Sequence, residues 1–509
     1  MKVAPPKRPR WRPWALITPG WRAVAITTDT GTEHYHGALQ VAEGLQQVEG
    51  HACYVEGNLS HLRHTTGATL WTADTWRGRA TRMHLAGTTL SVTTLRNTLS
   101  GYPDPASELD RALSWFRDQG VPPGSISGMA WSLWRSTLPH EVDIRGPSWS
   151  RSALYGGRQE AREAREYQGM HAVDITAAYP TAMADRPYPL TLRAVAPTTT
   201  LDPALGGLAR ARVWVDTELP HPPLPVRVAA DAIQWQWGVV EGIWPWVELA
   251  AAAAIGCRVE VIECWAPARE VDLFGGWWER VREGRALGGG AGRLVKAVSN
   301  SLWGLFAMTG DQRAQVRWTD DIGDRSMTIG VMSRRLPHAM TAHVAAETSA
   351  RVRARMLLEG LYGGPYHPVH VDTDGIIIRK SAPLPSPYGD QPGQWRIKTA
   401  MPRVDIRAPQ VYRHTCGTGC GITHPQWHYV ASGLPPKAAA HFFRKVPHGV
   451  RVGVRGMDLV LPPGHAADRA LLMAAHDAAR ALRTEVYGAP LGMDYGGSVG
   501  VLPRPTEVV

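Results

Sequence analysis

The stretch HPVHVDTDGIIIR, from His367 to Arg379, places two aspartates between two β-branched segments. Valines alternate with other residues before the pair and three isoleucines follow it, so the pattern predicts two strands joined by a tight Asp-Gly hairpin. The carboxylates of Asp372 and Asp374 would then stand at the exposed tip of the hairpin. Carboxylates this close repel each other unless a cation lies between them, and Mg2+ suits hard oxygen ligands of this kind. For an isolated DTDG, a solvated turn would be the better interpretation.

The length and charge of the chain predict a large, basic protein of several domains. A chain of 509 residues is too long for one hydrophobic core. Lys and Arg number 55 against 45 Asp and Glu, a formal net charge of +10, which favours a polyanionic partner. Five cysteines, an odd number, argue for a reducing compartment. No apolar run is long enough for a membrane span, and the N-terminus lacks a secretory signal, so we expect a cytoplasmic protein without membrane contact.

Apolar periodicity divides the chain into segments of different character. Residues 1–20 form a basic, proline-rich arm, and residues 190–271 are strand-like with no catalytic pattern. A strand is expected at 24–26, and linker sequence at 139–152. Helices are expected at 108–119, 125–135, 159–166, 340–358 and about 466–486.

A helical hairpin is predicted over 272–308, with its turn at three consecutive glycines, Gly288 to Gly290. Its second arm carries Lys296, Asn300 and Trp303 on or near one face. A cation, an amide and a flat ring on one helix face would suit a nucleotide. A structural face with a snorkelling lysine is the alternative.

Three motifs now stand in a fixed order: DITAAYP from Asp174 to Pro180, KAVSNSLWG from Lys296 to Gly304, and HVDTDG from His370 to Gly375. Their order and spacing resemble motifs A, B and C of family B DNA polymerases. YGGR, Tyr155 to Arg158, resembles the family's element that joins the exonuclease and polymerase modules and contacts the template. APQVY, Ala408 to Tyr412, lies where the family places its primer-contacting K-x-Y motif.

The resemblance covers about residues 150–435, and it favours the protein-primed branch of phages and linear plasmids. The compact size, the YxGG element and the long gaps between motifs A, B and C support this branch, because the gaps could hold its two insertions. The implied fold is a mixed α+β, right-hand polymerase of palm, fingers and thumb, with an N-terminal RNase H-like exonuclease-type domain. The implied boundaries are an exonuclease-like domain at 21–150, palm at 151–190 and 340–450, insertions at 191–271 and 308–339, fingers at 272–307, and thumb at 451–509.

The resemblance implies nucleotidyl transfer with two Mg2+ ions, for which Mn2+ could substitute. Asp174 and Asp372 would bridge the ions, and Asp374 would support them. Tyr179 would exclude a 2′-hydroxyl and so select deoxynucleotides. Four further residues would bind the incoming nucleotide or line the nascent base pair: Lys296, Asn300, Trp303, which replaces the usual tyrosine, and Arg285. Six would contact DNA: Tyr155, Gly156, Gly157, Arg158, Gln410, which replaces the usual lysine, and Tyr412.

The function that the resemblance implies is DNA-directed DNA synthesis in replication of phage or plasmid DNA, in a bacterial or phage-infected cell. The partners would be primer–template DNA, dNTPs and, with protein priming, a terminal protein. One alternative is a catalytically silent factor that binds primer–template DNA. Another is a primer-independent or lesion-tolerant polymerase.

The N-terminal domain is expected to lack exonuclease activity. The family's first exonuclease motif is D-x-E, but Ile26 to Asp29 offers threonines and one aspartate. The counterpart of the second motif, Asn58 to Leu62, has no carboxylate. For the third motif, Asp104, Asp110 and Asp118 are candidates, but none stands in the expected Y-x3-D frame. Two-metal sites need their carboxylate ligands. We therefore expect a domain that keeps the exonuclease fold but has lost exonuclease catalysis.

A cluster of zinc-type ligands lies near the end of the resemblance: His414, Cys416, Cys420, His424 and His428. Their spacing matches no standard zinc finger. A loop with chance cysteines and histidines is therefore favoured over a metal site.

Overall fold

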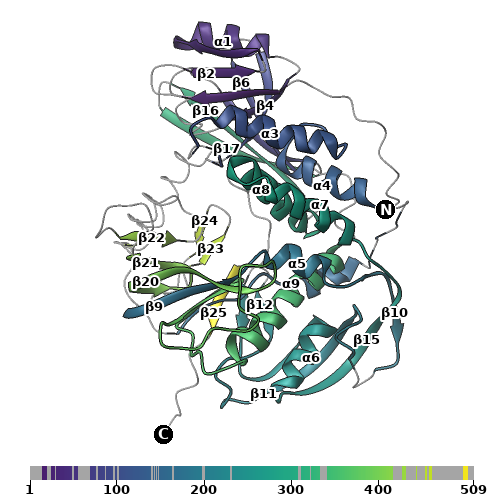
Figure 1. Ribbon diagram of the computed structural model, residues 1–509. Coiled ribbons are helices and arrows are strands. Elements are labelled where there is room, and N and C mark those ends of the chain that lie inside the picture. Colours follow the sequence, from purple (N-terminus) through teal and green to yellow (C-terminus); the bar gives the residue numbers. More distant parts are fainter. Residues whose placement is uncertain are drawn as a thin grey trace. The chain divides into compact units, whose positions relative to one another are not determined.

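A computed structural model describes residues 14–55, 69–99, 102–162, 165–229, 232–307, 311–332 and 341–416, with short gaps in several of these ranges, and residues 427–431, 443, 453–455, 458–460 and 497–501. The chain divides into two compact units (Figure 1). The first unit is Met1–Ile144 with Leu273–Met340 and Arg483–Met493; the second is Arg145–Asp272 with Thr341–Leu482 and Asp494–Val509. No helix among the described residues is long and apolar enough to cross a bilayer.

A nine-stranded sheet forms one part of the first unit, in the order β17-β16-β5-β6-β7-β4-β1-β2-β3. Strand β1 runs parallel to β4, and β4 runs parallel to β7. The strand expected at 24–26 is confirmed as β2. The candidate second insertion supplies β16 and β17, which join the sheet through β5. The bounds are β1 Trp14–Pro19, β2 Val24–Thr28, β3 Gly31–Tyr35, α1 Gly37–Gln47, β4 Ala52–Val55, β5 Thr69–Thr75, β6 Gly78–Leu85, β7 Thr88–Thr94, β16 Asp311–Asp320 and β17 Gly323–Met332.

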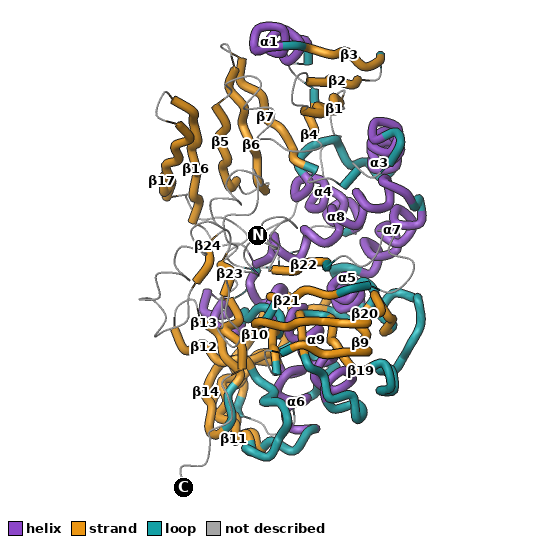
Figure 2. Tube along the Cα trace, turned by 90° about the vertical axis from the view of Figure 1, so that its left-hand side faces the viewer, coloured by secondary structure: helices purple, strands orange, loops and turns teal. Residues whose placement is uncertain are grey.

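Four helices pack together in the rest of the first unit (Figure 2): α3 (Pro105–Asp118), α4 (Ile126–Thr137), α7 (Gly275–Ala286) and α8 (Gly289–Ala307). They confirm the two helices and the helical hairpin expected from periodicity. Asp104 accepts a hydrogen bond from the Ser107 amide, and Ser125 accepts one from the Gly128 amide, so both α3 and α4 begin at side-chain caps. The α7–α8 turn has positive φ values of 65° and 57° at Gly288 and Gly289, which glycine adopts without strain.

A seven-stranded sheet, ordered β22-β21-β20-β9-β19-β18-β8, forms the centre of the second unit. Its isoleucines and valines pack against α9, which is apolar on this side. Helix α9 continues as a π-helix, Met356–Leu361. The bounds are β8 Gln159–Ala161, β9 Glu166–Ile175, α5 Ala178–Ala184, α9 Ala342–Arg355, β18 His370–Asp372, β19 Gly375–Arg379, β20 Trp395–Ala408, β21 Val411–His414 and β22 His428–Ala431.

The helix expected over 159–166 is wrong. Gln159–Ala161 instead forms β8, which pairs with the hairpin strand β18. The segment is charged and short, so helical spacing was a weak signal, and tertiary pairing decided its conformation. The helix expected over 340–358 is confirmed as α9, whereas the helix at about 466–486 lies outside the described residues.

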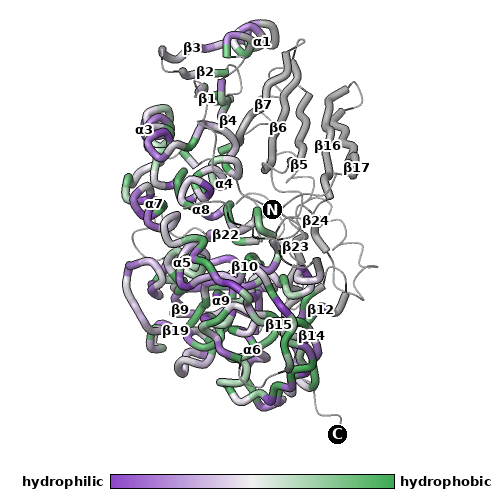
Figure 3. Tube along the Cα trace, turned by 90° about the vertical axis from the view of Figure 1, so that its right-hand side faces the viewer, coloured by the Kyte–Doolittle hydropathy of each residue, from purple (hydrophilic) through white to green (hydrophobic). Residues whose placement is uncertain are grey.

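Residues 188–271 form a strand-rich region, as expected, with one helix that periodicity did not predict. The four-stranded sheet has the order β10-β15-β11-β14, and a three-stranded sheet has the order β12-β13-β25. Helix α6 (Trp246–Ala254) is apolar on nearly every side (Figure 3) and buries Trp246, Leu249 and Ala252. The remaining bounds are η1 Ser148–Ala153, β10 Tyr188–Val195, β11 Leu208–Val215, β12 Pro225–Ala229, β13 Ala232–Trp235, β14 Gly238–Pro245, β15 Arg258–Val271, β23 Gly453–Arg455, β24 Asp458–Val460 and β25 Gly497–Val501.

Candidate active site

Strand pairing brings the three predicted carboxylates to one end of the central sheet. Strand β9 carries Asp174, and Gly375, the first residue of β19, is its direct partner. The predicted hairpin is confirmed, because β18 ends at Asp372 and pairs with β19. Asp374 is half-buried, and burial together with the charges of Asp174 and Asp372 raises its pKa to about 6. The three side chains therefore share one electrostatic environment.

The hairpin turn is enclosed rather than exposed. Asp372, Thr373 and Asp374 are all half-buried, so the expectation of an exposed tip is wrong. The Thr373 amide donates to the Arg158 carbonyl at 2.7 Å, and the Ile175 amide donates to the Asp374 carbonyl at 2.9 Å. Thr373 also has a positive φ of 57°, an uncommon conformation for a β-branched residue. Neighbouring backbone from both sides thus fixes the turn.

The YGGR element packs against this turn. A Cβ atom placed on Gly157 would lie 2.6 Å from the Thr373 methyl group, so a glycine is required for the close approach. Tyr155 and Arg158 are each only 3% exposed. Both side chains are buried inside the second unit, and DNA contact by this element stays a prediction.

Arg158 takes part in a buried network beside the hairpin. Its Nε donates to Glu160 at 2.9 Å, and Glu160 also lies 3.1 Å from His221 Nδ1. Burial alone would raise the pKa of Glu160, but Arg158 and His221 outweigh it and hold the pKa at about 2. The carboxylate therefore stays ionised, and the network joins β8 to the segment at His221 and Pro222.

Asp174 is held by two cations from β20. Arg396 Nε lies 3.2 Å from one carboxylate oxygen of Asp174, and Lys398 Nζ lies 3.4 Å from the other. Lys398 is the extra residue in the irregular pairing between Ile397 and Thr399. No motif pointed to either cation, and only the register of β20 against β9 reveals them.

Gln410 contacts the site directly. Its Nε2 donates to Asp372 Oδ1 at 2.7 Å, and its backbone amide donates to His370 Nε2 at 3.0 Å. The ring of Tyr412 lies 5.1 Å from that of His370. The residue that replaces the family's lysine therefore binds a predicted metal ligand, a contact that the sequence did not indicate.

The predicted metal ligands are carboxylates with interacting charges, and such a donor set suits a hard divalent cation. As the side chains lie, however, no three His, Cys, Asp or Glu residues within the described chain are arranged to hold a metal ion. Asp174 points to Arg396 and Lys398, and Asp372 points to Gln410. The ligands would have to turn from these partners toward an ion.

Tyr179 lies in the first turn of α5 and packs, half-buried, against the apolar core between the central sheet and α9. Burial raises its pKa, and the charges of Arg353 and Asp374 act on it. Arg353 is itself fixed by Glu248 at 2.6 Å and by the Tyr155 carbonyl at 2.7 Å. The predicted sugar-sensing residue therefore lies near Asp374.

The predicted nucleotide residues of α8 lie in the first unit. Lys296 and Asn300 are exposed and Trp303 is half-buried, whereas the opposite side of the helix buries Val295, Val298 and Leu302. Arg285, at the end of α7, is half-buried. The predicted common face is confirmed, and nucleotide binding by these four residues stays a prediction.

The three carboxylates proposed for the third exonuclease motif lie apart from one another in the first unit. Asp104 caps α3, Asp110 accepts a hydrogen bond from Trp14 Nε1 at 3.1 Å, and Asp118 lies at the end of α3. On β2, Thr27 is hydrogen-bonded to Thr32 at 2.9 Å. The residues Asn58 to Leu62 lie outside the described part of the chain. Within that part, no cluster of metal ligands forms in this unit.

Part of the Cys and His cluster comes together on β21 and β22. Cys416 Sγ lies 2.9 Å from His428 Nε2, and the rings of His414 and His428 stack at 5.2 Å. Cys420 and His424 lie outside the described residues. The described members do not form a group of three that could hold a metal.

Comparisons with known proteins agree with the motifs and the fold. Residues 125–330 match the family described as DNA polymerase type B, organellar and viral. The structure of Phi29 DNA polymerase with primer-template DNA and incoming nucleotides is 13% identical, covers 88% of this chain and 96% of its own, and has a TM-score of 0.61. Its binary complex with primer-template DNA is 12% identical, covers 89% and 99%, and has a TM-score of 0.58. No curated protein matches the sequence.

At 12–13% identity these structures establish a shared fold. The predicted mixed α+β, multidomain architecture of the family B polymerase type is therefore confirmed. The matched segment contains two of the three polymerase motifs, those at Asp174 and Lys296. Over residues 125–330 the chain is thus similar in sequence to the organellar and viral type of family B DNA polymerase, and its fold is shared with Phi29 DNA polymerase.

Proposed function

We propose that this chain is a DNA-directed DNA polymerase that adds dNTPs to a 3′-hydroxyl on a primed template. The observation that carries the proposal is the convergence of Asp174, Asp372 and Asp374 at one end of the central sheet. Three partly buried carboxylates within one electrostatic environment cost folding free energy, so such an arrangement points to a functional site.

The carboxylates would hold two divalent ions, Mg2+ or Mn2+. When bound, such ions activate the attacking hydroxyl and stabilise the charge on the leaving pyrophosphate. Asp174 and Asp372 would bridge the ions, and Asp374 would act as a supporting carboxylate. Arg396 and Lys398 would hold the Asp174 side chain until an ion binds, and Gln410 would hold that of Asp372.

The α7–α8 hairpin would act as the fingers and supply the nucleotide face. Lys296 would neutralise the triphosphate charge with help from Arg285. Asn300 and Trp303 would line the nascent base pair. Tyr179 would stand against the sugar, where its ring would exclude a 2′-hydroxyl.

The partners of the Phi29 polymerase structures, primer-template DNA and nucleotides, are proposed for this chain as well. Its basic charge supports binding through phosphates, with little sequence preference and steep salt dependence. The finer proposal is a protein-primed enzyme that uses a terminal protein, acts in a bacterial or phage-infected cell, and has no exonuclease activity. DNA contact by the YGGR element, Tyr155 to Arg158, and by Gln410 and Tyr412 belongs to the same proposal.

The test is extension of a primed template by the wild type and by Asp372→Asn, with Asp390→Asn as a matched control on an exposed residue. Synthesis by the wild type and the control, but not by Asp372→Asn, is expected. Equal synthesis by all three proteins would overturn the site.

The same assay separates the alternatives. DNA binding without extension, with or without an added terminal protein, would favour the catalytically silent factor. Extension on bare template would favour the primer-independent polymerase.

A further inference from the structure

The tip of the α7–α8 hairpin is bound by helix α3 of the N-terminal segment. Glu108 accepts a hydrogen bond from the Ala291 amide, in the first turn of α8, at 2.8 Å. Arg111 pairs with Glu108 at 3.0 Å and donates from Nη2 to the Leu287 carbonyl at 2.8 Å. A carboxylate at a helix N-terminus is stabilised by the free amides and by the helix dipole. Glu108 and Arg111 therefore connect the end of α7 with the start of α8.

The glycines of the turn fit this contact. A Cβ on Gly289 would lie 2.9 Å from Glu108 Oε1, and one on Gly290 would lie 2.9 Å from Glu108 Cβ. Real Cβ atoms do not approach other atoms so closely. The glycine run that the sequence marked only as a turn thus also makes room for a residue of α3.

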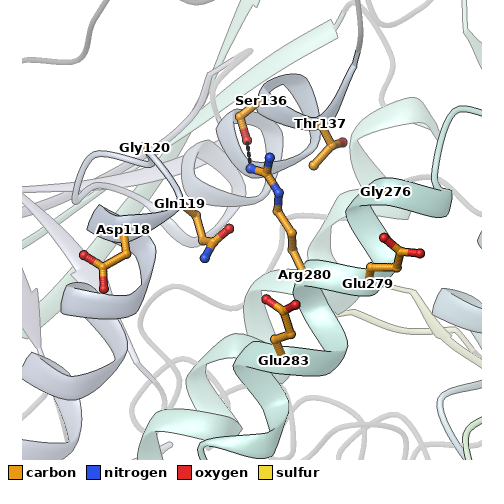
Figure 4. Close-up of a pocket in the computed structure, with 9 residues that line it drawn as sticks. All are labelled: Asp118, Gln119, Gly120, Ser136, Thr137, Gly276, Glu279, Arg280 and Glu283. Carbon is orange, nitrogen blue, oxygen red and sulfur yellow. Dashed lines mark hydrogen bonds between the residues drawn. The ribbon is translucent and has the colours of Figure 1, made fainter.

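The other end of the hairpin is bound by α4. Trp134 Nε1 donates to the Leu273 carbonyl at 2.8 Å, and the rings of Trp134 and Phe306 meet edge to face at 5.0 Å. Arg280 donates to Ser136 Oγ at 3.0 Å beside a polar hollow of ≈ 610 Å³ (Figure 4). Buried aromatic contacts of this kind resist sliding, because each ring fills a specific space.

The two anchoring points leave one face of α8 exposed. Helices α3 and α4 both pack against α8, and the buried side contains Val298 and Leu302. Lys296 and Asn300 remain exposed. The N-terminal helices thus determine which side of α8 is presented.

We infer that α3 and α4 hold the α7–α8 hairpin as one rigid block, and that Glu108 and Arg111 are positioning residues for the nucleotide face of α8. This inference rests on the proposed function. It gives the N-terminal segment a role in nucleotide addition that does not depend on exonuclease activity. Movement of the hairpin toward a nucleotide would carry α3 and α4 with it.

The test compares Glu108→Gln and Arg111→Gln with Arg117→Gln, a control on the same helix whose side chain donates to Ser114 Oγ within that helix. For both test variants, the dNTP KM should rise about fivefold, the loss expected for a helix cap. The kcat and the Kd for primer–template DNA should stay within about twofold. Hydrogen–deuterium exchange of residues 284–295 should become faster, and the control should match the wild type.

Faster exchange with an unchanged dNTP KM would show a merely structural contact and would overturn the positioning role. Unchanged exchange would overturn the rigid block itself. Failure of the wild type to synthesise DNA would refute the proposed function. Hydrogen–deuterium exchange requires no catalysis, so it would still decide whether α3 holds the hairpin.

Discussion

The two units of this protein use their carboxylates in opposite ways. In the second unit, Asp174, Asp372 and Asp374 gather at one end of a sheet, and the pKa of Asp374 rises to about 6. In the first unit, the aspartates at candidate exonuclease positions are separate, as Asp104 caps a helix and Asp110 bonds to Trp14. A carboxylate with a structural partner adds stability, whereas a repulsive cluster persists only where function needs it. The contrast separates a candidate catalytic centre from a scaffold.

The largest expected effect comes from Asp174→Asn. Removing one charge from the cluster should lower the rate of nucleotide addition by at least about a thousandfold, because the site would lose a bridging ligand. The matched change in the first unit, Asp110→Asn, should leave the rate within about twofold. Single-turnover primer extension measures both variants, and a comparable loss in the two would erase the contrast between the units.

The next effect is expected from Gly157→Ala. The added methyl would lie 2.6 Å from the Thr373 side chain, so the turn between Asp372 and Asp374 must shift. Overpacking of this kind costs about 1–3 kcal/mol of unfolding free energy, and we expect a drop in extension of about tenfold or more. Gly124→Ala, where a methyl meets nothing within 4 Å, is the control. Thermal unfolding measures the stability of both variants, and primer extension measures their activity. Equal stability and equal extension rates in the two variants would contradict the close packing.

The raised pKa of Asp374 predicts a pH dependence of metal-free stability. Its pKa is about 6 in the folded protein, against 3.8 in the unfolded reference. The folded state therefore holds the proton more tightly, and this stabilisation is present below pH 4 and lost as the pH rises through 6. The loss should be roughly 1–3 kcal/mol. Asp374→Asn should remove it from denaturant titrations with chelator between pH 4 and 7, and an unchanged pH profile would contradict the coupling.

The smallest effect is expected from Lys398→Ala. Lys398 is 65% exposed in its pair with Asp174, and exposed pairs contribute about 0.2–1 kcal/mol. Removal of this competing cation should strengthen Mn2+ binding about two- to fivefold. Electron paramagnetic resonance titration measures free Mn2+, with the exposed Lys380→Ala as control. Weaker Mn2+ binding in Lys398→Ala would show that the lysine supports the site instead of competing for it.

Local sequence patterns predicted the elements whose signals are short-range. The Asp-Gly hairpin, the caps before α3 and α4, and the glycine turn before α8 depend on neighbouring residues, so they could be located before the fold was known. The association of Asp174 with Asp372 came from the order of family motifs. It depends on the antiparallel pairing of β9 with β19, which no local pattern specifies.

The failures share a physical cause in tertiary contacts. The charged segment after Arg158 forms β8 because it pairs with β18 and because Glu160 forms buried contacts with Arg158 and His221. The contact of Gln410 with Asp372, and that of Glu108 with α8, join residues far apart in the chain. Burial of Tyr155 and Arg158 likewise depends on packing, so a motif alone did not reveal that these side chains face inward.

The most direct measurement uses one labelled primer annealed to a longer template, with Mg2+ present, in the presence and absence of dNTPs. We predict that the wild type lengthens the primer with dNTPs and leaves its length unchanged without them. Shortening without dNTPs would show that the first unit contains a working exonuclease. Failure to lengthen the primer while DNA binding is intact, even with a terminal protein supplied, would contradict a catalytic centre at Asp174, Asp372 and Asp374.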